Sequence, residues 1–141
     1  MSRLVAAARA YNGAKFRHRG RTKNGLDCAG LIWIAYADCG VVLPDFRLYS
    51  SEPHDDGLVR YISAALGEPA LLAAPARAQL QVGDVIVQRF DQEPHHVALL
   101  TNYPLGGLAM IHADGHTERV VEHRLSDDHI QRITHVFRKP I

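Results

Sequence analysis

The chain has 141 residues, a mass of 15.6 kDa and a formal net charge of +1, and 47% of its residues are hydrophobic. This length fits one domain, which we expect to cover residues 1–141. The small net charge argues against a nucleic-acid partner. No apolar run approaches the roughly 20 residues of a membrane span.

The N-terminal segment does not have the pattern of a secretion signal. Arg3 and Arg9 interrupt it, so it lacks the apolar stretch of roughly 7–15 residues that a signal peptide contains. We therefore expect a soluble chain made in the cytoplasm. If its substrate lies beyond the membrane, another component must carry the chain there.

The first predicted elements are a helix and a basic loop. Residues 2–12 are rich in alanine with spaced apolar residues, which indicates a short amphipathic helix. Residues 17–26 are polar and contain glycine, which indicates a loop. The basic run over residues 15–23 is interpreted as a solvated face or as a rim that attracts an anionic polymer.

A second helix is predicted between Asp27 and Gly40. Asp27 is a favourable N-cap, and Gly40 is a common C-terminal stop. The residues between them are apolar almost all round, so we expect this helix to be buried in the centre of the fold. A further helix is predicted over residues 55–66, followed by an irregular connection to about Leu80.

The second half of the chain predicts strands. Five segments are short, rich in Val, Ile and aromatic residues, and separated by turn residues: 84–90, 95–101, 107–113, 118–122 and 132–138. Successive short strands with no helices between them favour an antiparallel sheet. Helices followed by such a sheet make an α+β domain.

The two cysteines lie at opposite ends of the second predicted helix. At ~1.5 Å per residue, Cys28 and Cys39 would be about 16 Å apart along its axis, whereas a disulfide needs Cα atoms within about 7 Å. Two free thiols fit a reducing compartment. Cys28 follows the N-cap, where the helix dipole favours a thiolate nucleophile; the alternative is an inert buried cysteine. Cys39 is predicted to be a core residue.

Two histidines in the predicted sheet could act on such a thiol. If the hairpin of 95–101 and 107–113 has its loop centred on Pro104, paired residue numbers sum to 208 and His96 lies across from His112. A four-residue loop would instead place His95 across from His112. The alternative is that these histidines are surface residues or core residues with satisfied hydrogen bonds.

A metal site is the other chemical interpretation of the histidines. His95, His96, His112 and His116 are possible ligands, but Asp114-Gly115 predicts a turn there, and the chain has no CxxC or HExxH pattern. We therefore expect no metal and no cofactor. The remaining histidines are predicted to be solvated: His18, His54, His123, His129 and His135.

Five segments together resemble one protein family, the NlpC/P60 cysteine peptidases. Leu26-Asp27-Cys28-Ala29-Gly30-Leu31 is similar to the family's Asp-Cys-Ser-Gly-Leu/Phe signature. The other four, in chain order, are Gly13-Ala14-Lys15-Phe16, Leu80-Gln81-Val82-Gly83-Asp84-Val85-Ile86, His96-Val97-Ala98-Leu99-Leu100 and Met110-Ile111-His112-Ala113. The resemblance implies a papain-like fold in which the nucleophile-bearing helix packs on a C-terminal antiparallel sheet.

The resemblance also implies roles for individual residues. Cys28 would be the nucleophile, His96 the base and His112 the group that orients the base. Asp27 would bind the free amino end of a stem peptide. The alternative role is the helix cap, because one carboxylate can hardly do both well.

Phe16 and Ala29 occupy two further substrate-binding positions of the family. Phe16 stands where the family has Tyr, so it has no hydroxyl, and Ala29 stands where the family has Ser. Lys15 replaces the Pro of the family's Gly-x-Pro-Tyr turn. These departures affect the expected rate and substrate preference, while the Cys-His-His set is intact.

The function implied by the resemblance is hydrolysis of an amide bond in peptidoglycan stem peptides, usually the γ-D-glutamyl–diamino acid bond. Residues 132–140 and Tyr49-Ser50 resemble versions of the family from phage tails and gene transfer agents, so phage-like tail proteins are expected partners. Two alternatives remain. One is a structural tail component with this fold and little turnover, and the other is a thiol amidase or acyltransferase with another substrate.

Overall fold

The computed structural model describes residues 2–45, 57–90 and 93–141. The helices are α1 (Ser2–Arg9), α2 (Cys28–Asp38), α3 (Gly57–Leu66) and α4 (Asp127–Gln131), with a short 3-10 helix, η1 (Arg77–Gln79). The strands are β1 (Arg21–Thr22), β2 (Gly25–Leu26), β3 (Leu71–Leu72), β4 (Val85–Phe90), β5 (Glu93–Asn102), β6 (Leu108–Asp114), β7 (Arg119–Arg124) and β8 (Ile133–Phe137).

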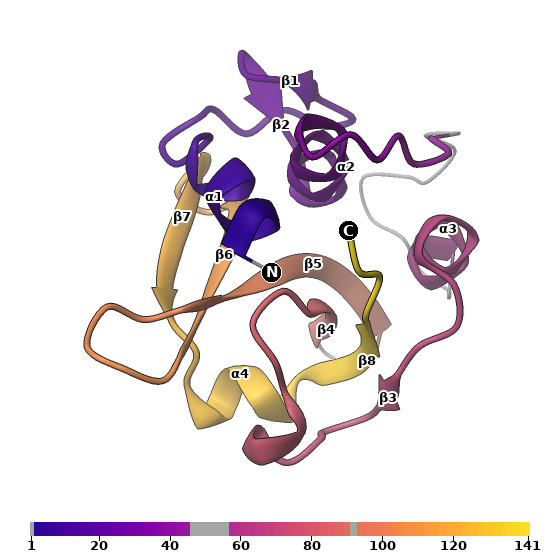
Figure 1. The fold of residues 1–141 in the computed structure, drawn as a ribbon, viewed down its shortest axis with the longest axis vertical. Helices are drawn as coiled ribbons and strands as arrows, with labels where there is room; N and C mark the ends of the chain where they lie inside the picture. The colour runs from indigo at the N-terminus through magenta and orange to yellow at the C-terminus, as the bar shows by residue number, and fades with distance from the viewer. Residues whose placement is uncertain (1, 46–56, 91–92) are drawn as a thin grey trace.

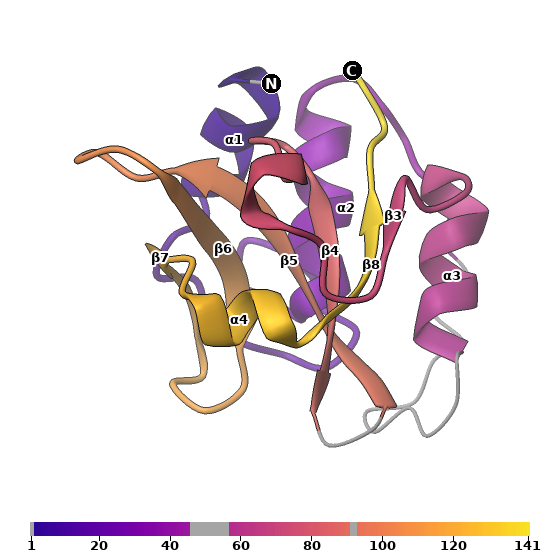
Figure 2. The same ribbon diagram turned by 90° about the horizontal axis from the view of Figure 1, so that it is seen from below.

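The centre of the fold is an antiparallel sheet with the strand order β3-β8-β4-β5-β6-β7. Helices α1, α2 and α3 cover one face of it, and α4 lies on the other face (Figures 1 and 2). A separate hydrophobic core fills each side: Val97 and Leu99 of β5 pack toward α2, whereas Ala98 and Leu100 pack with Ile130 of α4. The predicted α+β class, with a buried helix on a C-terminal antiparallel sheet, is confirmed.

Helix α2 is central because its sequence leaves no polar face. Its buried residues include Leu31, Ile32, Trp33 and Tyr36. The Trp33 ring stacks on Tyr61 of α3 with centroids 4.6 Å apart, which joins the two helices. No helix in the described part of the chain is long and apolar enough to cross a membrane.

Three connections contain structure that local sequence signals did not predict. The predicted loop 17–26 includes the small β1–β2 hairpin. The connection after α3 includes β3, which pairs with β8, and η1. Helix α4 follows β7, with Ser126 as its N-cap accepting a hydrogen bond from the His129 N–H.

The β5–β6 hairpin has a different register from the predicted one. Leu99 lies opposite Ile111 and Asn102 opposite Leu108, so paired numbers sum to 210 rather than 208 or 207. The reason is a turn over residues 103–107, in which Gly106 and Gly107 adopt positive φ angles of 99° and 85°. This turn shifts the centre of the loop by one residue, and the even sum keeps His96 and His112 on one face of the sheet.

Candidate active site

Cys28 is the first residue of α2, directly after its N-cap. The Asp27 carboxylate accepts a hydrogen bond of 2.7 Å from the Gly30 N–H, as an N-cap does. Gly30 is required by packing, because a Cβ there would lie 2.0 Å from the Gly20 carbonyl oxygen. The loop that carries the β1–β2 hairpin is thereby pressed onto the first turn of α2 and fixes the surroundings of the thiol.

The thiol lies where β5 and β6 separate. Among the described residues, the β5–β6 ladder extends only from Asn102 to Leu99, and Figure 2 shows the two strands diverging beyond it. The Leu100 N–H points toward the start of β4, where it donates a hydrogen bond of 2.8 Å to the carbonyl oxygen of Asp84, the residue before the strand. Because N–H directions alternate along a strand, the Val97 N–H points toward the gap, and it lies close enough to the Cys28 sulfur to lower the pKa of the thiol. The sulfur therefore lies against the main chain next to His96.

The environment of Cys28 opposes its ionisation. Burial and the neighbouring Asp27 carboxylate raise the pKa of Cys28 to about 12, although the N–H groups of Val97 and Ala29 and the Arg21 guanidinium lower it. The position of Cys28 directly after a helix N-cap predicts an acidic thiol. That expectation is not met, because desolvation outweighs the favourable helix terminus in this site.

His96 and His112 form a hydrogen-bonded pair. His96 Nε2 lies 2.8 Å from His112 Nδ1, with the rings almost perpendicular. Burial lowers the pKa of His96 to about 4 and that of His112 to about 3. Both rings are therefore neutral at pH 7. They line an open pocket of about 360 Å³ together with Asp114, Gly115 and His116.

A third ring continues this pair and was missed in the sequence. His112 Nε2 lies 2.8 Å from Nε2 of His123 on β7, and the His123 Nδ1 lies 3.0 Å from the Arg124 carbonyl oxygen. His123 was predicted to be a solvated histidine. The signal that could have found it is the β6–β7 register: Val121 lies opposite His112, so His123 is its diagonal neighbour on the same face.

Both oxygens of the Asp27 carboxylate have partners within the protein. In addition to the hydrogen bond from the Gly30 N–H, the carboxylate accepts a hydrogen bond of 2.9 Å from the Arg19 N–H and forms an ion pair with Arg21 at 2.9 Å. Asp27 is only 3% exposed. Arg21 also pairs with Asp45 at 2.8 Å, so it lies inside the fold although the basic run was predicted to be solvated or a rim. The role of Asp27 in binding a substrate amine stays a prediction.

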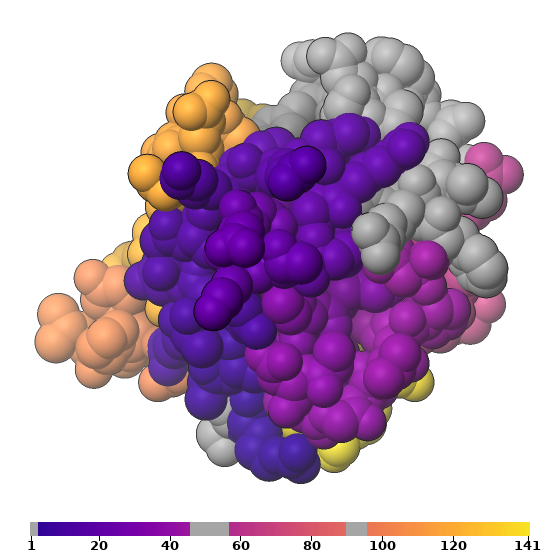
Figure 3. All heavy atoms as spheres, turned by 90° about the horizontal axis from the view of Figure 1, so that it is seen from above, coloured from indigo at the N-terminus to yellow at the C-terminus, as the bar shows by residue number. Residues whose placement is uncertain are grey.

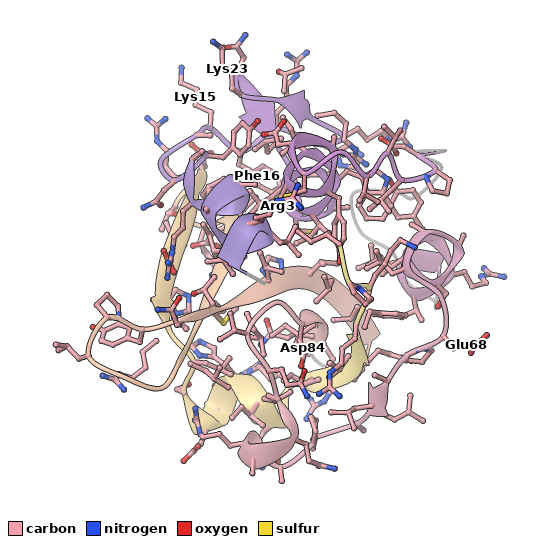
Figure 4. All side chains as sticks on the ribbon, viewed as in Figure 1. Arg3, Lys15, Phe16, Lys23, Glu68 and Asp84 are labelled. Carbon is pink, nitrogen blue, oxygen red and sulfur yellow. The ribbon has the colours of Figure 1, made fainter. Side chains whose placement is uncertain are left out.

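Phe16 connects the elements around the site. Its N–H bonds the Glu118 carbonyl before β7 at 2.9 Å, and its backbone bridges to Leu26. Figure 4 shows Phe16 on the inner side of the β1–β2 hairpin, whereas Lys15 and Lys23 point outward.

The N-terminal part of the chain forms most of the surface seen in Figure 3. Ala29 is fully buried, and the substrate contacts predicted for Phe16 and Ala29 stay predictions.

The remaining candidates lie apart from this constellation. Cys28 and Cys39 are both free thiols, and Cys39 is the C-cap at the far end of α2. The side chain of His95 and residues 49 and 50 lie outside the described residues. Within the described ranges, no three His, Cys, Asp or Glu side chains are grouped so that they could hold a metal ion.

Comparison with known proteins identifies relatives of the whole fold. A sequence model of the NlpC/P60 family matches residues 13–139. An NlpC/P60 family protein from Bacillus cereus is 22% identical with a TM-score of 0.65; the match covers 97% of this chain and 39% of that protein. The NlpC/p60 domain of the peptidoglycan hydrolase SagA is 17% identical with a TM-score of 0.59, and the match covers 97% of both chains.

A third solved structure is the peptidoglycan hydrolase RipB from Mycobacterium tuberculosis. It is 18% identical with a TM-score of 0.61, and the match covers 97% of this chain and 63% of that one. At these identities the likeness is one of fold. The chain spans about two fifths of the Bacillus cereus protein, and no curated protein matches it in sequence.

Proposed function

Because the chain belongs to the NlpC/P60 family, we propose that it is a cysteine peptidase that hydrolyses an amide bond in peptidoglycan stem peptides. The proposed target is the γ-D-glutamyl–diamino acid bond. The observation that carries the proposal is the placement of the Cys28 sulfur against the Val97 N–H, next to a base, His96, that is hydrogen-bonded to His112. A nucleophile, a base and a group that orients the base are the parts that acyl transfer requires.

The raised pKa of Cys28 and the lowered pKa of His96 define the resting site as a neutral thiol beside a neutral imidazole. The thiol proton passes to His96 as the sulfur attacks the carbonyl carbon of the substrate. The His96 imidazolium then gives this proton to the leaving amine, and the C–N bond breaks to leave a thioester on Cys28. Water, losing a proton to His96, attacks the thioester and restores the thiol.

The tetrahedral intermediates need hydrogen-bond donors for their oxyanion. The first N–H groups of a helix have no partner within the helix, so the N–H of Cys28 at the start of α2 is one suitable donor. A Tyr hydroxyl at position 16 would be a second donor, and Phe16 cannot supply it. We therefore propose a slow peptidase, since one oxyanion donor in a well-studied protease contributes about 2.7–4 kcal/mol.

A structural component with the same fold is the alternative, and two observations favour it. The thiol is kept protonated by burial, and Phe16 has no hydroxyl. Such a protein would bind its partners and leave purified sacculi intact. A thiol amidase or acyltransferase would use the same groups and differ only in its product.

Mass spectrometry of muropeptides tests the proposal. Purified sacculi are incubated with the wild type and with Cys28→Ala, and the released fragments are compared. We expect fragments cut between D-glutamate and the diamino acid with the wild type only. Intact sacculi with both proteins would contradict the proposal, and fragments released equally by both would show that Cys28 is not the nucleophile.

A further inference from the structure

Three imidazole rings from three neighbouring strands form one hydrogen-bonded row. The row runs from His96 on β5 through His112 on β6 to His123 on β7, with nitrogen–nitrogen distances of 2.8 Å at both junctions. Successive rings are nearly perpendicular, at 82° and 88°. The row ends on a main-chain atom, the carbonyl oxygen of Arg124, 3.0 Å from His123 Nδ1.

The end of the row determines where its protons are. A carbonyl oxygen only accepts hydrogen bonds, so the proton of this contact is on Nδ1 of His123. A neutral imidazole has a single N–H, so the His123 Nε2 is then an acceptor, and the His112 Nε2 must donate to it. By the same reasoning, the His112 Nδ1 accepts from the Nε2–H of His96.

This leaves one consistent arrangement for three neutral rings, with no proton on the Nδ1 of His96. Burial lowers the pKa of His96 and of His112, which keeps both rings neutral at pH 7. Nδ1 is bonded to Cγ, so it is the ring nitrogen nearer to the main chain. The Cys28 sulfur is held at the main chain of the next residue, Val97, and thus on the Nδ1 side of His96.

We propose that the Arg124 carbonyl, acting through His123 and His112, selects the tautomer of His96 whose Nδ1 can accept the thiol proton. His123 is thus a positioning residue for the base, two rings away from the thiol. The opposite arrangement, in which a donor at position 123 reverses each bond of the row, puts a proton on His96 Nδ1. That ring could no longer act as a base toward Cys28. This catalytic consequence rests on the proposed peptidase function, whereas the tautomers are a property of the resting protein.

The tautomers are measured directly by long-range ¹H–¹⁵N correlation NMR at pH 8, above the ordinary titration range of an imidazole. We expect His96 and His112 to be protonated on Nε2 and His123 on Nδ1. A wild-type spectrum with His96 protonated on Nδ1 would overturn the proposal. This result does not depend on turnover, so it separates failure of the inference from failure of the proposed function.

Two substitutions of similar size separate tautomer selection from a structural role of His123. The side chain is only half-buried, so a charged replacement should fold. His123→Glu presents only acceptors and should keep the Nε2–H tautomers of His96 and His112, with kcat on muropeptides within about threefold of the wild type. His123→Lys presents only donors and should invert both tautomers. Because a wrong tautomer lowers kcat by ~10⁴ in a well-studied serine protease, we expect a fall of at least about 100-fold.

Equal kcat values and equal spectra for the Glu and Lys variants would also overturn the proposal. A purely structural role of His123 predicts the same effect for both variants. His129→Gln is the matched control. Its ring lies 5.0 Å from that of His123, but its Nδ1 bonds the Ser126 N–H and no ring of the row. Glutamine at this position keeps the capping box of α4. The control should leave the His96 and His112 tautomers unchanged, and a change in them would count against the assignment to His123.

Discussion

Replacing Asp27 by Asn removes the charge beside the thiol while keeping an oxygen that can cap α2. The Asp27 Oδ1 accepts both the Gly30 N–H at 2.7 Å and Arg21 Nη1 at 2.9 Å. An Asn side chain offers the same oxygen. What it lacks is the second oxygen, which accepts the Arg19 N–H at 2.9 Å, and the negative charge that, after burial, is the largest cause of the raised pKa of Cys28.

The expected effect on the thiol is an increase in its reactivity. A like charge within a few ångströms shifts a pKa by about one unit or more, so Asp27→Asn should increase the thiolate fraction about tenfold at a given pH below 10. A less basic thiolate is also less nucleophilic, by about threefold for one pKa unit. The net prediction is alkylation of Cys28 by iodoacetamide about three times faster than in the wild type at pH 8.5.

The expected effect on stability is a moderate loss. Breaking a buried ion pair costs about 3–5 kcal/mol when the remaining charge has no partner, but Arg21 keeps Asp45 at 2.8 Å. We therefore expect a loss of roughly 1.5–3 kcal/mol, which is the contribution of a hydrogen bond to a charged group. For a chain of this length, that lowers the melting temperature by about 4–9 °C.

The assay is the rate of iodoacetamide labelling at Cys28 between pH 6 and 10, measured by mass spectrometry. The wild-type rate should rise with pH without a plateau, because the pKa of the thiol is about 12. Asp45→Asn is the control: it removes the other carboxylate of Arg21 and should change labelling by less than about twofold. Slower labelling of Asp27→Asn, or a wild-type plateau below pH 8, would refute the electrostatic account. An increase in KM for stem peptides with a free amino end, with unchanged labelling, would instead assign Asp27 to substrate binding.

Four further substitutions test other parts of the site. Gly30→Ala should lower the free energy of unfolding by about 1–3 kcal/mol in a denaturant titration, because its Cβ would overlap the Gly20 carbonyl; a loss below about 0.5 kcal/mol would contradict this. Phe16→Tyr should fold normally and raise turnover, by up to ~10²–10³ if the hydroxyl reaches the oxyanion, whereas a fall with an unchanged melting temperature would show a site reshaped around Phe. His96→Ala should lower kcat by ~10²–10⁴ and His112→Ala by less, and the reverse order would exchange their roles.

Local signals in the sequence were sufficient for the main elements. Asp27 and Gly40 mark the ends of α2 by the chemistry of helix caps, and the apolar residues between them imply burial. The strands are recognisable from their Val and Ile content. His96 and His112 were placed on one face because side chains alternate with period two, and an even register sum preserves that relation even when the pairing shifts.

Non-local features could not be read from the sequence. The shift in the β5–β6 register depends on the conformation of Gly106 and Gly107, and the sequence of this loop is compatible with several turn types. The contact of His123 with His112 depends on the β6–β7 register, and the link of this pair to His96 depends on the β5–β6 register as well. Arg21 lies inside the fold because Asp45 and Asp27, far apart in the chain, converge on it.

The pKa of Cys28 does not follow from the position of this residue in the helix alone. The helix terminus was visible in the sequence, but the desolvation that outweighs it depends on how β5 and the loop before α2 pack around the sulfur. The extent of the domain, the site of synthesis and the association with phage-like tail proteins stay predictions. None of them depends on the geometry of the site.

The central claim is that Cys28 forms a covalent bond with the substrate, and trapping the acyl-enzyme tests it most directly. The protein is mixed with muropeptides, quenched in acid and digested with trypsin. Cleavage after Lys23 and Arg47 gives a peptide that contains both Cys28 and Cys39, so fragmentation of this peptide locates the adduct. We predict a mass increase equal to the acyl part of the stem peptide on Cys28 and none on Cys39. Fragments released from the muropeptides without any adduct on Cys28, or with the adduct on Cys39, would contradict the account.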